Sequence, residues 1–201
     1  MAETPTRPRR MVVGISGASG SIYGVRLLRA LRAAGEVEIH LIVSASAKRT
    51  LVEETDFSVK DVEAMAHVVY YNRDTGAALA SGSFKTAGMV IAPCSVKTVS
   101  ALANCYADTL IARAGDVTLK EGRPLVVVVR ETPLHAGHLR QMLALAEMGG
   151  VILPPVPAFY QHPRTIDDIV DHTVARVLDR LGVAHSLIPE WTGGGRKPAA
   201  D

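Results

Sequence analysis

The sequence predicts a single-domain α/β protein, a three-layer α/β/α fold on a doubly wound parallel sheet of the Rossmann or flavodoxin-like kind. Five short apolar runs suit buried parallel strands, and helical patterns separate them. Strands and helices that alternate in this way build a parallel sheet with helices on both faces. The length of 201 residues, with 48% hydrophobic and 21% charged residues, suffices for one such domain with a buried core.

The first strand is expected at residues 11–15, where an apolar run leads into a glycine-rich turn. The helix after it, 22–34, places Leu27, Leu28 and Leu31 on one face. The later strands are apolar runs, of which Leu125 and four valines form the clearest. In order along the chain, these strands are expected at 37–43, 89–92, 125–129 and 151–153, and the later helices at 47–54, 60–66, 97–103, 108–120, 135–148 and 165–181.

Ligands of doubly wound sheets bind beyond the carboxyl ends of the strands. The candidate site therefore consists of the loops that follow the predicted strands, at 16–21, 44–48, 93–98, 130–138 and 154–162. At the end of the first strand and in the loop after it, glycines at 14, 17 and 20 let the backbone approach an anion, which the start of the next helix attracts. This turn suits the phosphate of a nucleotide, although a tight strand-to-helix turn without a ligand has the same pattern.

The second and third loops limit which ligand the site can bind. A dinucleotide-binding fold places an acidic residue after its second strand to hold the ribose, whereas this chain has Ser44, Ala45 and Ser46, which argues against NAD. The third loop, 93–98, brings two hydroxyls and an ammonium group to a helix start. Together the loops fit a mononucleotide such as FMN, although helix capping alone would also explain each serine or threonine.

Arg130 and Glu131 end the strand predicted at 125–129, so they are expected at the carboxyl edge of the sheet. Such a pair could serve a site, close the end of a strand or contact another subunit.

Composition excludes several classes of protein. The net charge of +2 is carried by the ends of the chain, because residues 1–10 hold +2 and 192–201 hold +1. With a body near −1 and only 4% aromatic residues, a nucleic-acid partner is not expected. No apolar run approaches the ~20 residues of a membrane span. Two cysteines give no disulfide framework, so a cytoplasmic protein is expected, with disordered tails at 1–10 and 192–201 around a domain at 11–191.

Seven spaced motifs closely resemble the bacterial flavin prenyltransferases of the UbiX family. They follow one another in the family's order and span most of the predicted domain, which is far more specific than any single glycine loop. They are GISGASGSIYGVR at 14–26, ETD at 54–56, SGS at 81–83, PCSVKT at 93–98, RAGDVTLK at 113–120, RETPLH at 130–135 and PPVPAFY at 154–160.

The resemblance implies a reaction. Enzymes of this family join the dimethylallyl group of dimethylallyl monophosphate to N5 and then C6 of reduced FMN, without a metal. The product, prenylated FMN, is the cofactor of UbiD-type decarboxylases, and the family forms homo-oligomers described as dodecamers with sites shared between chains. FMN is thus a substrate that occupies a cofactor-like site.

The resemblance also implies site residues. The flavin would be held by Gly17, Ala18, Ser19, Ser44, Ser95, Val96, Lys97, Thr98 and Arg130, and the prenyl phosphate by Arg113, Lys120, Tyr160 and Arg176. Cations around the phosphate make chemical sense, because negative charge grows on it as the allylic C–O bond breaks. Glu131 is the candidate for proton transfer at C6, with Ser19 and Glu54 as relay members and Lys120 at the leaving group.

Three other features have a structural interpretation that we prefer. Asp167-Asp-Ile-Val-Asp171 spells the magnesium motif of isoprenyl diphosphate synthases, but it follows Thr165, a good N-cap, and complements a helix dipole. His135 and His138 have no evident third ligand for zinc. Cys94 has no identified base and suits a buried apolar position.

Two other functions stay open on the sequence. A flavin-dependent cysteine decarboxylase would be expected to have a loop like PASANT, where this chain has PCSVKT at 93–98. A non-catalytic flavin carrier or decarboxylase subunit would keep the same binding residues. Trp191, the one tryptophan, could cover a pocket or contact a neighbouring subunit.

Overall fold

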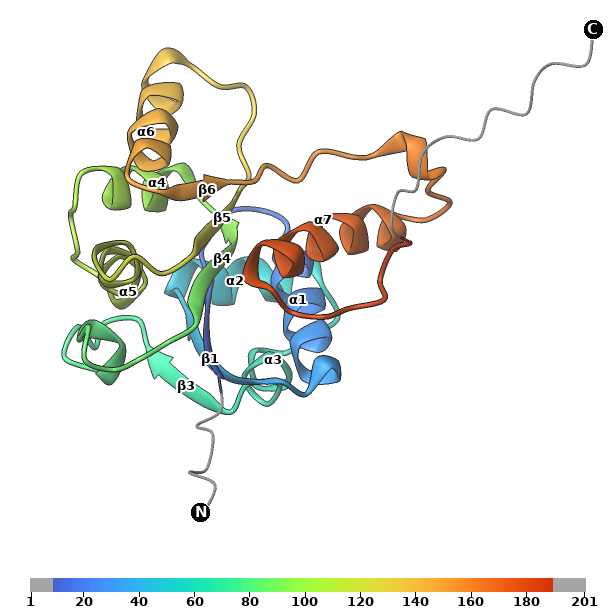
Figure 1. Ribbon diagram of the computed structural model, residues 1–201. Helices are drawn as coiled ribbons and strands as arrows, with labels where there is room; N and C mark the ends of the chain where they lie inside the picture. Colours follow the sequence, from blue (N-terminus) through green and yellow to red (C-terminus); the bar gives the residue numbers. More distant parts are fainter. Residues whose placement is uncertain (1–8, 190–201) are drawn as a thin grey trace, which may run out of the picture.

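The computed structural model describes residues 9–189 and contains a six-stranded parallel sheet (Figure 1). The strand order is β3-β2-β1-β4-β5-β6, the order of doubly wound dinucleotide-binding sheets, and removal of the edge strand β3 leaves the flavodoxin order. The predicted fold class is confirmed. The strands are β1 (Arg9–Ile15), β2 (Val37–Val43), β3 (Val68–Tyr71), β4 (Gly88–Cys94), β5 (Leu125–Val129) and β6 (Gly150–Ile152).

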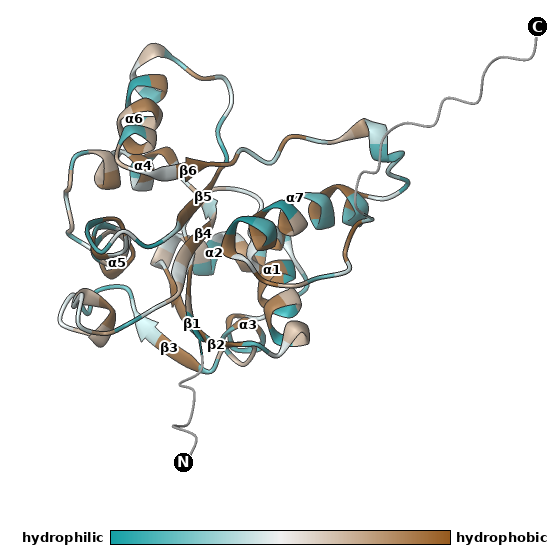
Figure 2. Cartoon of the chain, viewed as in Figure 1, coloured by the Kyte–Doolittle hydropathy of each residue, from teal (hydrophilic) through white to brown (hydrophobic). Residues whose placement is uncertain are grey.

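Helices cover both faces of the sheet, as the alternating pattern predicted. Alternate residues of the strands point to opposite faces and pack into two cores, one against α1, α2, α3 and α7 and the other against α4, α5 and α6. Figure 2 shows the resulting pattern, an apolar sheet between helices with hydrophilic outer surfaces. The helices are α1 (Ser21–Ala34), α2 (Ala45–Glu54), α3 (Val59–Glu63), α4 (Val96–Ala103), α5 (Leu110–Lys120), α6 (Ala136–Glu147) and α7 (Ile166–Leu181), with 3-10 turns η1 (Ala78–Ala80) and η2 (Phe159–Gln161).

Two features of the sheet differ from those predicted. Arg9 and Arg10 belong to β1 and not to a tail, because they pair with Val37 and Glu38 of β2. The Arg9 guanidinium also donates to the carbonyls of Leu181 and Gly182 at the end of α7. Strand β3 was not among the predicted strands. It is short and lies at the sheet edge, where its side chains alternate between exposed and partly buried.

The carboxyl ends of β1 and β4 lie side by side at the point where the strand order reverses. A backbone hydrogen bond joins the two loops there, from the Ser16 amide to the Pro93 carbonyl at 3.2 Å. A crevice at this position is where doubly wound folds bind their ligands.

A proline-rich segment, residues 153–165, leaves β6 and runs outward to the start of α7; we call it the arm (Figure 1). Leu153 packs against the core at the base of the arm, whereas Val156, Phe159 and Tyr160 are exposed. No helix among residues 9–189 combines the length and apolar character that crossing a membrane requires.

Candidate functional site

A cleft lies at the carboxyl edge of the sheet, beside the switch point between β1 and β4. Small and polar side chains from the loops after four strands, β1 to β4, line it together with the start of α5. They are Ser16, Gly17, Ser44, Ser46, Asn72, Ser95, Lys97, Thr98, Ala101, Asp108, Thr109, Ile111 and Ala112. We call this the strand-end cleft.

Ser16 joins the loops that follow β1 and β4. Its buried hydroxyl donates to the Pro93 carbonyl at 3.0 Å and accepts from the Ser95 amide at 2.8 Å. Ser95 in turn is the N-cap of α4, where its hydroxyl accepts from the Thr98 amide and lies 3.1 Å from the Thr98 hydroxyl. The predicted capping of this helix is therefore present, and the same hydroxyls line the cleft.

The second loop approaches the first very closely. Ser44 caps α2 through the Ala47 amide, and its hydroxyl lies 3.1 Å from that of Ser46. A Cβ on Gly17 would stand 2.2 Å from Ser46 Oγ and 2.5 Å from Ser46 Cβ. Only glycine fits at position 17 with Ser46 in place, so the absent side chain keeps this wall of the cleft flat.

The start of α1 corrects one prediction. The amides of Gly20 and Ser21, which the glycine turn offers to an anion, are bound by Glu54 Oε2 at 2.8 and 3.0 Å. Burial raises the pKa of Glu54, but hydrogen bonds from the Ser19 hydroxyl and these two amides outweigh it, so that the pKa lies below its usual value. The anion at this helix start is a carboxylate of the chain itself.

Arg130 lies at the carboxyl edge of the sheet, as its position after β5 predicted. It is exposed, and its amide donates to the Cys94 carbonyl at the end of β4. Its charge is felt by Tyr23 of α1: burial raises the pKa of that phenol and Arg130 lowers it in part. Glu131 is half-buried and accepts from the Thr132 amide at 3.1 Å.

The four residues expected around the prenyl phosphate fall into two groups on opposite faces of the sheet. Arg113 and Lys120 belong to α5, whereas Arg176 belongs to α7, and these helices pack into different cores. Because α5 runs back toward the amino edge, its last residue, Lys120, lies at the edge opposite the strand-end cleft, where it pairs with Glu121 at 3.1 Å. One chain does not bring all four groups together.

Within each group the contacts are close. Arg113 donates to the Ala80 carbonyl at 3.2 Å and to Asp116 at 2.8 Å. On the other face, Tyr160 and Arg176 line one cavity beside the arm. Arg176 there donates to Asp179 at 2.7 Å.

The acidic motif of α7 is structural, as we expected. Asp168 accepts from the amides of Arg164 and Thr165, and Thr165 caps the helix in return. Asp171 binds the Arg26 guanidinium through both oxygens, which ties α7 to α1, and Asp167 lies 3.5 Å from the same guanidinium. All three carboxylates of the motif are thus engaged within the chain.

The histidine pair and Cys94 also have structural roles. His135 caps α6 by accepting from the Gly137 amide at 3.0 Å, and its ring lies against that of His138 at an angle of 31°. Among residues 9–189, no three His, Cys, Asp or Glu side chains gather as a metal site requires. Cys94 is fully buried, as expected for an apolar position, and burial raises the pKa of its thiol. Trp191 lies outside the described residues.

Sequence reasoning missed part of the cleft, most clearly Asn72. This residue follows β3, and its carbonyl and side-chain oxygens accept from the amides of Leu110 and Ile111 at the start of α5. The run Val-Val-Tyr-Tyr at 68–71 is typical of a strand and would have pointed to the loop behind it. Asp108 and Thr109 carry no such signal, because they precede a helix and do not follow a strand.

Comparison with known proteins identifies the family. The Flavoprotein family profile matches residues 1–178. The protein named flavin prenyltransferase UbiX of Escherichia coli K12 is 54% identical over 187 residues, which cover 92% of this chain and 99% of the relative. A solved structure described as AnUbiX (PadA1) in complex with FMN and dimethylallyl pyrophosphate superposes with a TM-score of 0.91 at 44% identity, over 94% of this chain and all of the other.

A second solved structure is similarly close to this chain. It is described as a dodecameric FMN-dependent UbiX-like decarboxylase from Escherichia coli O157:H7, and it superposes with a TM-score of 0.90 at 50% identity, over 92% of this chain and 100% of the other. Identity at this level over nearly whole chains shows more than a shared fold. The chain belongs to the UbiX family of flavin prenyltransferases.

Proposed function

We propose that this protein transfers the dimethylallyl group of dimethylallyl monophosphate to N5 and C6 of reduced FMN, which gives prenylated FMN. The observation that supports this most is the strand-end cleft at the switch point, in a chain 54% identical to a named flavin prenyltransferase. FMN is a substrate here, and a UbiD-type decarboxylase in the same cytoplasm is the proposed recipient of the product.

The strand-end cleft suits the phosphate and polar edge of FMN. The hydroxyls of Ser44, Ser95 and Thr98 line it, and Lys97 adds a positive charge at the start of α4. Gly17 keeps the opposite wall free of a side chain. Ala18, Ser19, Val96 and Arg130 do not line this cleft, so we assign them to the ring end of the flavin.

The cationic groups have a clear task in this reaction. As the allylic C–O bond breaks, its electron pair leaves with the phosphate, and an electron pair of flavin N5 forms the first new bond. Guanidinium and ammonium groups held in place around the phosphate stabilise the growing charge without a metal. We assign this task to Arg113, Lys120 and Arg176, with the Tyr160 hydroxyl as a further donor.

Because those four residues lie on two faces of the sheet, we propose that copies of the chain complete one another's sites in a homo-oligomer. The arm and α5 then belong to different copies at each site. A dodecameric solved relative at 50% identity supports an assembly of this kind.

The second bond joins C6 to the tertiary carbon of the prenyl double bond. Its formation requires addition of a proton to the other carbon of that double bond and loss of the C6 proton. Glu131 is the proposed acceptor, because it is half-buried at the carboxyl edge beside Arg130. Glu54 is held ionised at the start of α1 and contacts Ser19. We therefore assign Glu54 the task of orienting the Ser19 hydroxyl, and its low pKa makes it a poor proton donor.

The test is anaerobic incubation of the protein with reduced FMN and dimethylallyl monophosphate, followed by mass spectrometry of the flavin. A flavin heavier by one five-carbon unit is expected. Flavin that is bound but unchanged in mass would favour a flavin carrier and contradict the proposal.

Glu131→Gln gives the matched control. The variant keeps the size of the side chain but cannot accept the proton, so it should bind FMN as the wild type does and lose turnover. Full activity in this variant would remove Glu131 from the mechanism.

A further inference from the structure

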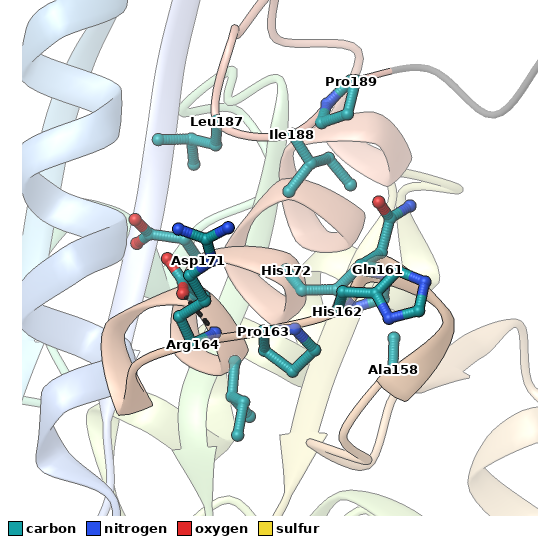
Figure 3. Close-up of a pocket in the computed structure, with 12 residues that line it drawn as sticks. Ala158, Gln161, His162, Pro163, Arg164, Asp171, His172, Leu187, Ile188 and Pro189 are labelled. Carbon is teal, nitrogen blue, oxygen red and sulfur yellow. Dashed lines mark hydrogen bonds between the residues drawn. The ribbon is translucent and has the colours of Figure 1, made fainter.

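A cavity beside the arm holds a histidine that the proposed mechanism does not use. Tyr160, His172, Arg176, Asp179 and His185 line this cavity. His172 also borders two adjoining hollows, one under the arm and one beside β6. Figure 3 shows it on α7, facing the part of the arm that carries Gln161 and His162.

The contacts of His172 join the two groups assigned to the phosphate on this face. Its Nε2 lies 3.4 Å from the Tyr160 hydroxyl, and the two rings are nearly perpendicular. Arg176 lies one helical turn further along α7, so both side chains leave the same face of the helix. A hydroxyl, an imidazole and a guanidinium therefore border one hollow.

Arg176 keeps donors for a ligand. Asp179 accepts from Nη1 of Arg176 at 2.7 Å, and its other oxygen lies 3.0 Å from Nε2 of His185. A guanidinium has five N–H donors, so one bond to Asp179 leaves most of them available. The carboxylate holds the guanidinium in position while the remaining N–H groups can meet an anion.

We propose that His172 is a positioning residue of the phosphate site and takes up a proton when a phosphate monoester binds beside Tyr160 and Arg176. In the protein without ligand, His172 is neutral and is the hydrogen-bond partner of the Tyr160 hydroxyl. When the negatively charged ligand binds, His172 is protonated and becomes a second cation beside Arg176. This inference rests on the proposed function for the identity of the ligand, and on the cavity for the site.

The charged and titratable groups around His172 fit this change. The pKa of His172 is lowered. Burial has the largest effect and the charge of Arg176 lowers the pKa further, while Asp179 raises it in part. A bound phosphate offsets the effect of Arg176, so the pKa must rise and a proton enters. The groups that share the three hollows with His172 are Tyr160, His162 and Arg164 of the arm region, Asp168, Asp171, Arg176, Asp179 and Arg180 of α7, and His185.

Phosphate should bind more tightly at lower pH. Because the bound form holds the proton more tightly, binding strengthens as the pH falls through the range between the two pKa values. A difference of one unit between them corresponds to about tenfold in affinity. The second ionisation of a phosphate monoester lies near pH 6, and that of inorganic phosphate lies about one unit higher. The effect is therefore measured as the ratio of the dissociation constants of variant and wild type at each pH, in which phosphate ionisation cancels.

The experiment measures the dissociation constant of inorganic phosphate on FMN-loaded protein between about pH 5.5 and 8, by isothermal titration calorimetry in buffers of different ionisation enthalpy. His172→Gln keeps a hydrogen-bonding group but cannot take up a proton. The ratio of variant to wild-type dissociation constants should be about one at pH 8 and rise as the pH falls, toward a limit of about tenfold for a pKa difference of one. Proton uptake on binding should fall in the variant by up to about half a proton at a pH between the two pKa values.

His162→Gln is the matched control, because His162 borders the hollow under the arm but not the cavity of Tyr160 and Arg176. Its ratio should stay near one at every pH. A flat ratio for His172→Gln with unchanged proton uptake, in a variant that unfolds at the wild-type temperature, would overturn the inference. So would phosphate that fails to bind.

The mass assay on the same preparations keeps the two proposals apart. If phosphate binding depends on pH through His172 but the flavin mass is unchanged, prenyl transfer is contradicted and the titratable site is supported. If the protein prenylates FMN but phosphate binding does not depend on pH through His172, prenyl transfer is supported and the titratable site is contradicted.

Discussion

Glu54 shows how a single side chain fixes the start of a helix. Its carboxylate binds the amides of Gly20 and Ser21, and these charge-assisted bonds complement the dipole of α1. Glu54→Gln should therefore lower the free energy of unfolding by about 1 kcal/mol at pH 7, a value kept small because the side chain is largely exposed. Urea denaturation measures the change.

The pH dependence of this contribution has a definite sign. The pKa of Glu54 is lowered in the folded protein, so its stabilisation is complete above the ordinary value of 4.5 and is lost as the pH falls through the folded value. The difference between wild type and Glu54→Gln should shrink toward pH 3. Glu53→Gln is the control, because Glu53 forms only an exposed pair with Arg49 and should change stability by a few tenths of a kcal/mol. Equal effects of the two variants would refute our description of Glu54.

Gly17 gives a second test at the residue scale. A methyl group at this position collides with Ser46, including its Cβ, so the first two loops of the strand-end cleft must separate. Gly17→Ala should weaken FMN binding at least tenfold, measured by flavin fluorescence. Adding Ser46→Gly removes the collision and should restore most of the affinity. If the double variant binds no better than Gly17→Ala, the close approach of the two loops is not the reason for the glycine.

At the scale of elements, Arg26 joins α1 to α7 through the two oxygens of Asp171. Lysine keeps the charge but cannot make the paired contact. Arg26→Lys should cost about 2 kcal/mol of stability, since hydrogen bonds to charged groups are worth about 1.5–3 kcal/mol. The measurement is again denaturant unfolding.

Asp167→Asn is the control for this contact, because Asp167 is exposed and lies 3.5 Å from the guanidinium. It should have little effect. A larger loss from Asp167→Asn than from Arg26→Lys would mean that the exposed carboxylate, and not Asp171, holds the two helices together.

The fold could be predicted from the sequence where the pattern was strong. Strands buried on both faces, such as β1, β4 and β5, contain continuous apolar runs, and the helices between them carry one apolar face. β3 was missed because an edge strand of four residues buries only part of each side chain. The two arginines that open β1 were missed because polarity suggested a tail, whereas pairing with β2 decides the strand.

The strand-end cleft could be predicted in part for a related reason. Parallel strands bring their carboxyl ends to one edge whatever the residues between them, so Ser44, Ser95 and Thr98 could be placed together from the sequence. The pattern of residues could not identify the partner of the glycine turn, because Glu54 reaches α1 from the end of another helix; only the family resemblance grouped Glu54 with Ser19. Nothing local to residues 14–21 indicates that contact.

At the scale of the whole molecule, the distribution of cations is the main result. Lys120 and Arg176 lie on helices that cover opposite faces of the sheet, yet both are assigned to one phosphate. Lys120→Ala and Arg176→Ala should each reduce turnover about 100-fold or more, in line with the loss of one held donor at a growing charge. Mixed oligomers of the two variants should recover activity, because some sites then contain both groups.

The control is a mixed oligomer of Lys120→Ala with the double variant Lys120→Ala/Arg176→Ala. No chain in this mixture has Lys120, so the mixture should stay inactive. If the first mixture is no more active than its components, each site takes both groups from one chain, and the proposed sharing is wrong.

The central claim is that the protein forms two bonds between the flavin and a five-carbon group. Isotopically labelled dimethylallyl monophosphate, incubated anaerobically with reduced FMN and the protein, tests it most directly when the flavin product is examined by mass spectrometry and nuclear magnetic resonance. We predict a labelled flavin with new carbon bonds at N5 and C6. Recovery of unlabelled FMN from protein that has bound both substrates would contradict the account.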